Sequence, residues 1–215
     1  MYTPASFREE RLDVLHGLIT AHPLGALVHQ DEHGLTADHL PFEIAAPTPE
    51  APFGTLRAHV ARANPVWKTA GAQQEVLVIF QGPHAYITPA WYAEKQESGK
   101  VVPTYNYALV HAHGPLRVID ERDWLLDLVT RLTAHHEAQH ASPWAVSDAP
   151  ADYIDRLLKA IVGIEIPLTR LTGKWKLGQN RSQQDQSRMA AGLAASDMPA
   201  AAQALAALMT SRVDI

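Results

Sequence analysis

The sequence predicts an α+β protein in which an antiparallel barrel or sandwich precedes a group of helices. Up to about residue 118, short β-prone segments follow one another closely with turn residues between them, which is typical of antiparallel barrels and sandwiches. Segments with helical spacing come afterwards and do not alternate with strands, as in α+β proteins. Because no repeat or linker divides the 215 residues, we expect one domain over residues 1–215, with residues 182–215 as a helical C-terminal extension.

The first predicted elements are a helix and a hairpin. Ser6-Phe7-Arg8-Glu9 matches the capping-box pattern and precedes leucines at helical spacing, which predicts a helix over residues 7–21. The β-prone residues 24–30 and 35–44 flank the turn sequence Asp31-Glu32-His33-Gly34, and this arrangement predicts a hairpin.

A proline-rich loop and three more strands are expected next. The prolines fall in residues 45–52, and residues 54–61 follow as a strand. The continuous apolar run Val76-Leu77-Val78-Ile79-Phe80 predicts a strand buried on both faces. Gly82-Pro83 indicates a turn into another strand over residues 85–88.

The remaining chain changes from strands to helices. Residues 94–100 are polar and predict an exposed loop, and residues 101–118 predict one or two strands broken near Gly114-Pro115. We then expect a helix over residues 121–140, a helix over residues 151–162, a strand over residues 164–171 and, beyond Ser182, a helical segment with an alanine-rich end from Ala200 to Met209.

Composition excludes several classes of function. The chain has no cysteine, so it has no disulfide, no thiolate zinc site and no cysteine nucleophile. Its net charge of −5 gives no overall basic field to attract nucleic acid, although local basic patches remain. The first residues lack the pattern of a signal peptide, and no apolar run has the length of a membrane span. We therefore expect a cytoplasmic protein without membrane contact.

His136-Glu137-Ala138-Gln139-His140 satisfies the HExxH pattern of zinc proteases. Histidines four residues apart on one helix can bind zinc, with the glutamate as the base. The motif, however, occupies the last turn of its predicted helix, and a chain with 12 histidines matches short histidine patterns by chance. We expect no metal site here; zinc found by metal analysis would reverse that expectation.

Two segments far apart in the sequence combine aromatic, amide and basic residues. They are residues 102–111 and 174–181, and the second contains Lys174, Lys176 and Arg181. Aromatic and amide groups suit a planar ring, and arginine and lysine suit a phosphate. No P-loop, GxSxG or GxGxxG pattern is present, so the common nucleotide and hydrolase signatures are missing.

Ordered short motifs along the chain resemble the PaiB-like family, described as FMN-binding negative transcriptional regulators. The matching residues are Met1-Tyr2-Thr3-Pro4, Phe7, His39-Leu40-Pro41-Phe42, His59, Ala61-Arg62-Ala63-Asn64-Pro65, Trp67, Gly82-Pro83, Ala85-Tyr86-Ile87, Pro89, Trp91-Tyr92, Val102-Pro103-Thr104, Asn106-Tyr107, Val110-His111, Ile161-Val162-Gly163, Glu165-Ile166, Lys174, Lys176-Leu177 and Gln179-Asn180-Arg181. The resemblance covers the chain from its first residue to about Leu193.

This resemblance implies an antiparallel split β-barrel with flanking helices, related to pyridoxamine-phosphate oxidase, that binds FMN at a homodimer interface. It makes Arg62 and Lys174 candidates for the FMN phosphate, with His59 and Asn64 beside Arg62 in the sequence. Further cofactor-binding candidates are Thr104, Tyr105 and Asn106 near the ring or ribityl chain, and Gln179, Asn180 and Arg181, which could close the site from the other subunit.

Three residues depart from the family pattern. Tyr105 replaces a usual tryptophan but keeps a stacking face. Gly178 replaces a usual serine and removes a hydroxyl. Asp38 replaces a usual small hydroxyl residue, and because a carboxylate repels a phosphate, we expect it either to face away from the cofactor or to weaken its binding.

The resemblance leaves two functions open. One is a flavin-binding transcriptional regulator or flavin-linked sensor, for which the sequence shows no recognisable DNA-reading element. The other is an FMN-dependent oxidoreductase acting on a small molecule, for which no residue is an evident catalytic acid, base or nucleophile. In either case FMN would carry the redox chemistry and the protein would orient it.

Overall fold

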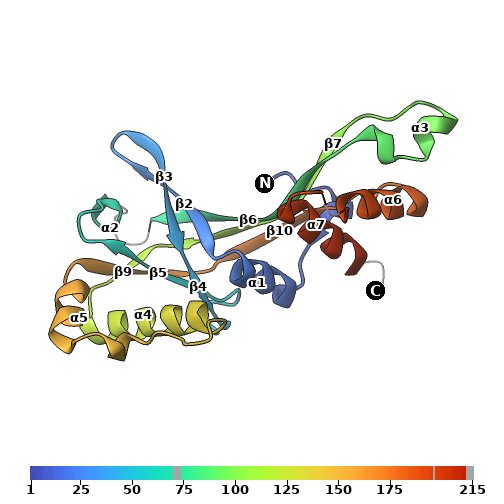
Figure 1. The fold of residues 1–215 in the computed structure, drawn as a ribbon. Helices are drawn as coiled ribbons and strands as arrows, with labels where there is room; N and C mark the ends of the chain where they lie inside the picture. The colour runs from blue at the N-terminus through green and yellow to red at the C-terminus, as the bar shows by residue number, and fades with distance from the viewer. Residues whose placement is uncertain (70–73, 196, 212–215) are drawn as a thin grey trace. The chain divides into compact units, whose positions relative to one another are not determined.

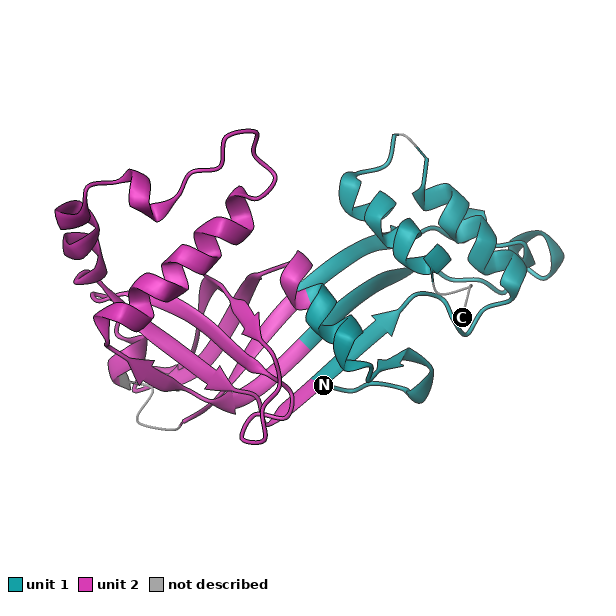
Figure 2. Cartoon of the chain, turned by 90° about the horizontal axis from the view of Figure 1, so that it is seen from below, with its two compact units in different colours: residues 1–18, 81–110, 172–215 teal, residues 19–80, 111–171 magenta. Residues whose placement is uncertain are grey.

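The computed structural model describes residues 1–69, 74–195 and 197–211, whose helices and strands are drawn in Figure 1. They form two compact units, coloured separately in Figure 2. Unit 1 comprises residues 1–18, 81–110 and 172–215, and unit 2 comprises residues 19–80 and 111–171. Each unit combines helices with antiparallel strands, which agrees with the predicted α+β class. Among the described helices, none is long and apolar enough to cross a membrane.

Unit 1 is built on a sheet with the strand order β1-β10-β7-β6. Its strands and helices are η1 (Ala5–Phe7), β1 (Arg8–Glu9), the first part of α1 (Leu12–Ala21), the second part of β6 (Glu75–Ile87), η2 (Pro89–Trp91), α3 (Glu94–Glu97), the first part of β7 (Thr104–Pro115), most of β10 (Arg170–Lys176), α6 (Gln183–Leu193) and α7 (Ala200–Ser211). Helices α6 and α7 pack together, and the side chains of Leu193 and Leu205 are fully buried. The alanine-rich end of the chain is therefore part of the core of unit 1.

Unit 2 contains a hairpin, the other parts of β6 and β7, and a separate four-stranded sheet with the order β4-β5-β9-β8. Its further elements are β2 (Leu24–Asp31), β3 (Gly34–Pro41), β4 (Glu43–Ala45), β5 (Thr55–Ala61), α2 (Val66–Thr69), β8 (Arg117–Ile119), α4 (Arg122–Glu137), η3 (Val146–Asp148), α5 (Ala151–Leu158) and β9 (Ile161–Pro167). The predicted hairpin is confirmed, since β2 and β3 pair from Leu24 opposite Pro41 to Asp31 opposite Gly34.

The predicted N-terminal helix begins later than the capping-box pattern indicates. Arg8 and Glu9 form β1, paired with Lys174 and Gly173 of β10, and α1 starts at Leu12. The Glu9 side chain is buried, and its carboxylate accepts hydrogen bonds from the guanidinium of Arg11 at 2.9 and 3.0 Å. A buried carboxylate needs such partners, and it also accepts from the backbone N–H groups of Glu10 and Arg11 at 3.1 Å, so Glu9 is a strand residue whose side chain holds the segment that leads into α1.

The predicted turn at Gly82-Pro83 is wrong, because β6 runs through it. A Cβ on Gly82 would lie 2.8 Å from Leu18 Cδ1 and 3.2 Å from the carbonyl oxygen of Ala108. Glycine at this position therefore permits close packing within unit 1, which is the other common role of glycine in a strand. The apolar run before it is fully buried on one face only, since Leu77 and Ile79 are half-buried.

Several predicted boundaries also shift. The short helix α3 lies in the segment predicted as a loop over residues 94–100, and residues 161–176 form two strands, β9 and β10, in place of one. Helix α5 ends at Leu158, and β9 follows almost at once. A Cβ on Gly163 would lie 2.3 Å from Cζ3 of Trp124, so this glycine lets β9 pack closely against α4.

Candidate functional site

In unit 1, predicted cofactor residues meet on the neighbouring strands β7 and β10. Lys176 Nζ donates a short hydrogen bond to the hydroxyl of Thr104. Lys174 Nζ lies 5.4 Å from the ring centroid of Tyr107 and 5.9 Å from that of Tyr2, and it donates to the Tyr2 carbonyl at 3.1 Å. The two strands therefore bring two ammonium groups together with aromatic rings and a hydroxyl.

Asn106 contributes a buried amide to the same pair of strands. Its side chain is 1% exposed, and its Nδ2 has no hydrogen-bond partner in the described part of the chain. A buried amide donor without a partner costs roughly 1–3 kcal/mol. Such a group is more typical of a binding site than of a finished core.

Two aromatic rings of unit 1 are exposed side by side. Tyr105 of β7 and Tyr86 of β6 have exposed fractions of 55% and 49%. Their ring centroids are 6.0 Å apart in an edge-to-face arrangement. Such a pair presents an uncovered face of the kind that a flat ring or a second subunit can cover. The sequence analysis names both tyrosines, but only the pairing of β6 with β7 shows that their rings lie together.

The turn after β10 holds the remaining predicted residues of unit 1. The side-chain amide of Gln179 accepts from the backbone N–H of Leu177 at 2.7 Å and donates to the Trp175 carbonyl at 2.5 Å. Gln179 therefore shapes the turn with both ends of its amide. Asn180 is exposed. Arg181 lies 4.9 Å from the ring centroid of Tyr92.

In unit 2, the donors of Arg62 are engaged within the protein. Its guanidinium makes two hydrogen bonds to the carboxylate of Asp120, at 2.9 and 2.5 Å, and donates to the carbonyl oxygens of Lys159 and Ile161 at 2.8 and 3.0 Å. Hydrogen bonding to Asp120 raises the pKa of Arg62 and lowers that of Asp120. A phosphate at Arg62 would have to displace a carboxylate.

Asn64 is part of a polar chain across unit 2. Its Nδ2 donates to Asp38 Oδ1 at 2.7 Å, and its Oδ1 accepts from the backbone N–H of Val66 at 2.9 Å. The other oxygen of Asp38 lies 3.1 Å from Nε2 of His29, which is buried. The unusual carboxylate at position 38 thus binds two side chains of its own unit.

His59 of β5 lines a cavity between β5, α4 and α5. Its Nδ1 is buried and has no hydrogen-bond partner within the described ranges. Burial lowers the pKa of the imidazole, so the ring is neutral at pH 7. The neighbours of His59 in this cavity are mainly apolar, which differs from the surroundings of Arg62 and Asn64.

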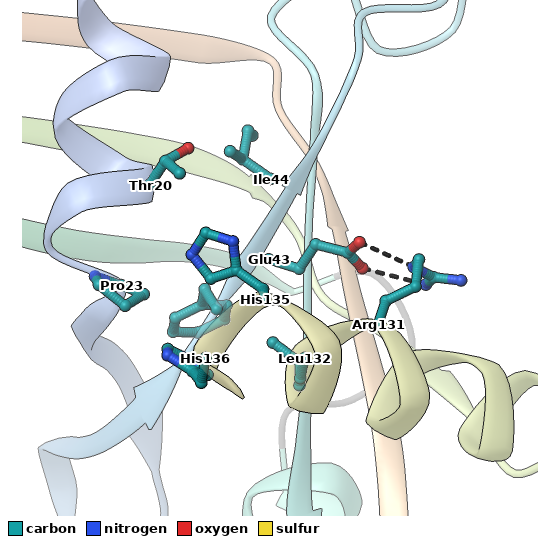
Figure 3. Close-up of a pocket in the computed structure, with 9 residues that line it drawn as sticks. Thr20, Pro23, Glu43, Ile44, Arg131, Leu132, His135 and His136 are labelled. Carbon is teal, nitrogen blue, oxygen red and sulfur yellow. Dashed lines mark hydrogen bonds and ion pairs between the residues drawn. The ribbon is translucent and has the colours of Figure 1, made fainter. Parts of the chain in front are cut away.

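Of the HExxH residues, His136 lines another pocket of unit 2, shown in Figure 3. This pocket, with a volume of about 200 Å³, is lined by His135 and His136 and by the Arg131–Glu43 ion pair, whose hydrogen bonds are 2.7 and 3.0 Å long. Helix α4 ends at Glu137, so His140 does not continue the helical face of His136. The described residues contain no group of three or more potential ligands that could hold a metal ion.

Comparison with solved structures identifies the class of fold. The FAD and heme binding protein from Mycobacterium smegmatis matches with a TM-score of 0.58 at 13% identity, covering 84% of this chain and 78% of that chain. The flavocytochrome Anf3 from Azotobacter vinelandii matches with a TM-score of 0.57 at 11% identity, covering 84% and 75%. The fold is that of the split-barrel flavoproteins, as the resemblance implied.

Sequence comparison identifies the family within this class. The family model described as "Putative FMN-binding domain" matches residues 1–170. The protease synthase and sporulation protein PAI 2 of Bacillus subtilis (strain 168) is 30% identical over 213 residues, covering 99% of this chain and 98% of the relative. An uncharacterized protein of Emericella nidulans, AN0679, is 37% identical over 225 residues, covering 89% and 90%. The chain belongs to the PaiB-like family of FMN-binding domains, and FMN is its cofactor.

The residues of unit 1 fit this cofactor. FMN combines a phosphate, a ribityl chain and a flat ring with amide-like edges, so it needs cations, polar side chains and aromatic faces. Lys174 and Lys176 supply cations, and Tyr105 supplies an exposed ring. The unpartnered Asn106 Nδ2 supplies a donor for which the described residues provide no acceptor.

Proposed function

We propose that unit 1 contributes the principal FMN contacts, with Lys174 at the phosphate and Asn106 and Tyr105 at the ring or ribityl chain. The observation that carries this proposal is the buried Asn106 amide, whose Nδ2 has no partner among the described residues and which stands on the strand next to β10 and its two lysines. Bound FMN exchanges electrons, and the side chains around it set its orientation and electrostatics. Thr104 keeps Lys176 in place through their hydrogen bond.

The other predicted residues then have supporting roles. Gln179 fixes the turn that carries Asn180 and Arg181. Arg181 lies 3.8 Å from a carboxylate oxygen of Glu94 and over the ring of Tyr92, and we propose that it and the exposed Asn180 contact the cofactor of the partner subunit. Arg62 and Asn64 act through Asp120 and Asp38, holding the polypeptide around them, and do not contact the phosphate. His59 belongs to the apolar cavity of unit 2 and is not part of the flavin site.

We infer that the functional form is a homodimer that places FMN at the subunit interface. The exposed pair of Tyr86 and Tyr105 favours this arrangement, because such rings gain free energy when another surface covers them. Sedimentation analysis with and without FMN tests the dimer. A monomer at all concentrations, with FMN bound, would contradict it.

We further propose that the protein is a flavin-linked transcriptional regulator that acts in the cytoplasm. The support is its family and its full-length similarity to the PAI 2 protein, whose name connects it with protease synthesis and sporulation. Since the net charge is −5, DNA binding would have to come from a local basic surface.

The first experiment is an absorption spectrum of the purified protein before and after addition of excess FMN and desalting. We expect a two-band flavin spectrum that survives desalting in the wild type and is lost from a Lys174→Ala variant. Retention by that variant, together with loss from Arg62→Ala, would transfer the phosphate contact to unit 2.

A gel-shift titration with the DNA upstream of its own gene, at low and moderate salt, tests regulation. Retardation that depends on FMN or on its redox state supports a flavin-linked regulator. Absence of retardation, combined with bleaching of the bound flavin by NADH or NADPH, would instead identify an FMN-dependent oxidoreductase.

A further inference from the structure

Unit 2 contains an apolar cavity that is separate in chemistry from any flavin site. It has a volume of about 310 Å³ and lies between β5, α4, the segment around Trp144, and α5. Apart from His59 and Thr133, every residue lining it is apolar. Burying a phosphate in such surroundings would cost far more free energy than the cavity could return, so FMN is not its ligand.

The mouth of the cavity is unusually apolar for a protein surface. Trp144 and Leu157 both line the cavity, and their exposed fractions are 46% and 47%. Val129 and Ile154 line it as well. A ligand that covered these side chains would remove apolar surface from water at roughly 25 cal/mol per Å².

His59 gives the cavity one specific polar group. Its Nδ1 is buried and without a hydrogen-bond partner in the residues that the structure describes. In a neutral imidazole one ring nitrogen donates and the other accepts. Because no described residue forms a hydrogen bond at Nδ1 that fixes the tautomer, the other ring nitrogen, Nε2, can either donate to or accept from a ligand, and that hydrogen bond would form in apolar surroundings.

Size narrows the class of ligand further. An apolar cavity of about 150 Å³ is known to hold benzene, and the cavity of unit 2 is roughly twice that volume. We propose that this cavity binds a neutral, fused two-ring aromatic compound that carries one hydrogen-bonding group, with that group directed at His59. This goes beyond the FMN-binding function, because the compound is a second ligand at a different place in the fold.

Indole and indene are a matched pair of probes, since both are fused bicyclic compounds and only indole has an N–H donor. Binding is measured by two-dimensional NMR of the FMN-loaded protein, following the side-chain N–H of Trp144, which is assigned with a Trp144→Phe variant. We expect both compounds to shift this resonance. We expect indole to bind about tenfold more tightly than indene, because only indole can form a hydrogen bond with His59 in the cavity.

Three variants make the test specific. His59→Phe keeps an aromatic ring of similar size, and we expect it to bring the affinities for indole and indene to within about twofold of each other. His33→Phe, at an exposed position of the β2–β3 turn, is the matched control and should leave the tenfold preference unchanged. Ala160→Trp fills the cavity and should abolish binding of both compounds while the protein keeps its FMN.

The outcomes separate this proposal from the flavin site. No shift of the Trp144 resonance with either compound would overturn the cavity as a binding site, and equal affinities in the wild type would overturn the role of His59. Displacement of indole by additional FMN would also overturn the proposal, because it would show that the two ligands share one site.

Discussion

Arg62 in unit 2 and Lys174 in unit 1 are both cations in motifs that indicate phosphate binding, but their surroundings differ. Arg62 donates to a carboxylate and to two carbonyl oxygens. Within the described residues, Lys174 donates one hydrogen bond, to the Tyr2 carbonyl, and its ammonium group lies near the rings of Tyr2 and Tyr107. A basic side chain can thus use its hydrogen-bond donors within the protein, as Arg62 does, or keep most of them for a ligand, as we propose for Lys174. Only the groups around the side chain distinguish the two cases.

The largest effect that we expect from this difference is on cofactor affinity. Loss of a charge-assisted hydrogen bond to a phosphate costs about 1.5–3 kcal/mol, so Lys174→Ala should weaken FMN binding about 10- to 100-fold. Fluorescence titration of FMN measures the change. Lys100→Ala, at an exposed position of unit 1, is the control and should bind FMN like the wild type.

Variants of Arg62 complete this test. Arg62→Ala should lower the thermal midpoint of unfolding and leave FMN affinity nearly unchanged, because its donors stabilise unit 2. Asp120→Ala should lower the midpoint similarly, and the two changes together should be less than additive. Tighter FMN binding by Asp120→Ala would contradict this assignment, since it would mean that the freed guanidinium reaches the phosphate.

The second effect concerns the carboxylate of Asp38, which binds Asn64 and the buried His29. Asp38→Ala leaves both partners unsatisfied and should reduce the free energy of unfolding by about 1–3 kcal/mol. Asp38→Asn keeps part of the network and should cost less. Chemical denaturation of both variants measures the difference; an unchanged stability for Asp38→Ala would show that the network contributes nothing.

The third effect is a dependence of stability on pH. Burial lowers the pKa of His111 to about 4 from 6.5, and nearby positive groups, Arg170 among them, act in the same direction. The unfolded chain therefore binds a proton more readily, so stability is complete above pH 6.5 and falls as pH decreases toward 4.

A pKa shift corresponds to about 1.4 kcal/mol of stability per unit. Because His111 is only half-buried, solvent screening reduces this value, and we expect a total loss of about 1–2 kcal/mol. Thermal unfolding between pH 7 and pH 4 measures it. A His111→Gln variant should show a flatter profile. An identical slope in the variant would assign the acid sensitivity to other histidines whose pKa values are also lowered by burial, namely His22, His59 or His113.

The smallest effect should come from restoring the family hydroxyl at position 178. Gly178 has a φ of +82°, which disfavours a side chain, and its Cβ position lies 2.5 Å from Cε of Met189 but 3.7 Å from Nδ2 of Asn106. A serine hydroxyl there could accept a hydrogen bond from Asn106 Nδ2, which has no partner in the part of the chain that the structure describes. This gain of about 1 kcal/mol opposes a strain of similar size.

We therefore expect Gly178→Ser to change the free energy of unfolding by less than about 1 kcal/mol, with Gly178→Ala clearly less stable than Gly178→Ser. Calorimetry of the two variants compares them directly. Equal stabilities would show that the hydroxyl does not reach Asn106.

The sequence was sufficient where local chemistry decides the structure and insufficient where distant contacts do. The hairpin around Gly34 follows from its turn residues, and Gly34 has the positive φ that such turns require. Glu9 lies in a strand and not in the predicted helix, because it pairs with β10, which is far away in the sequence. Gly82 has the composition of a turn, yet close packing against Leu18 keeps it in a strand.

The same limit applies to the candidate site. Motifs predicted Lys174, Tyr105 and Asn106 as cofactor residues, because aromatic, amide and basic residues stand together in the sequence, and the structure places them on the neighbouring strands β7 and β10. The motifs did not reveal that the carboxylate of Asp120 binds the guanidinium of Arg62, or that the rings of Tyr86 and Tyr105 are in contact. Both facts depend on residues from separate elements, which no short motif contains.

The division of the chain between the two units has a consequence for protein synthesis. Residues 19–171 contain all of unit 2, whereas unit 1 combines residues 1–18 with residues 81–110 and 172–215. As the ribosome elongates the chain, the segments of unit 2 emerge before the last segment of unit 1, residues 172–215, has been synthesised. The strand β1 must wait for β10, its partner in the sheet. The amide of Asn106 and the two lysines of β10 can therefore come together only after residue 176 has been synthesised, so the proposed FMN contacts of unit 1 form after the segments of unit 2 have emerged.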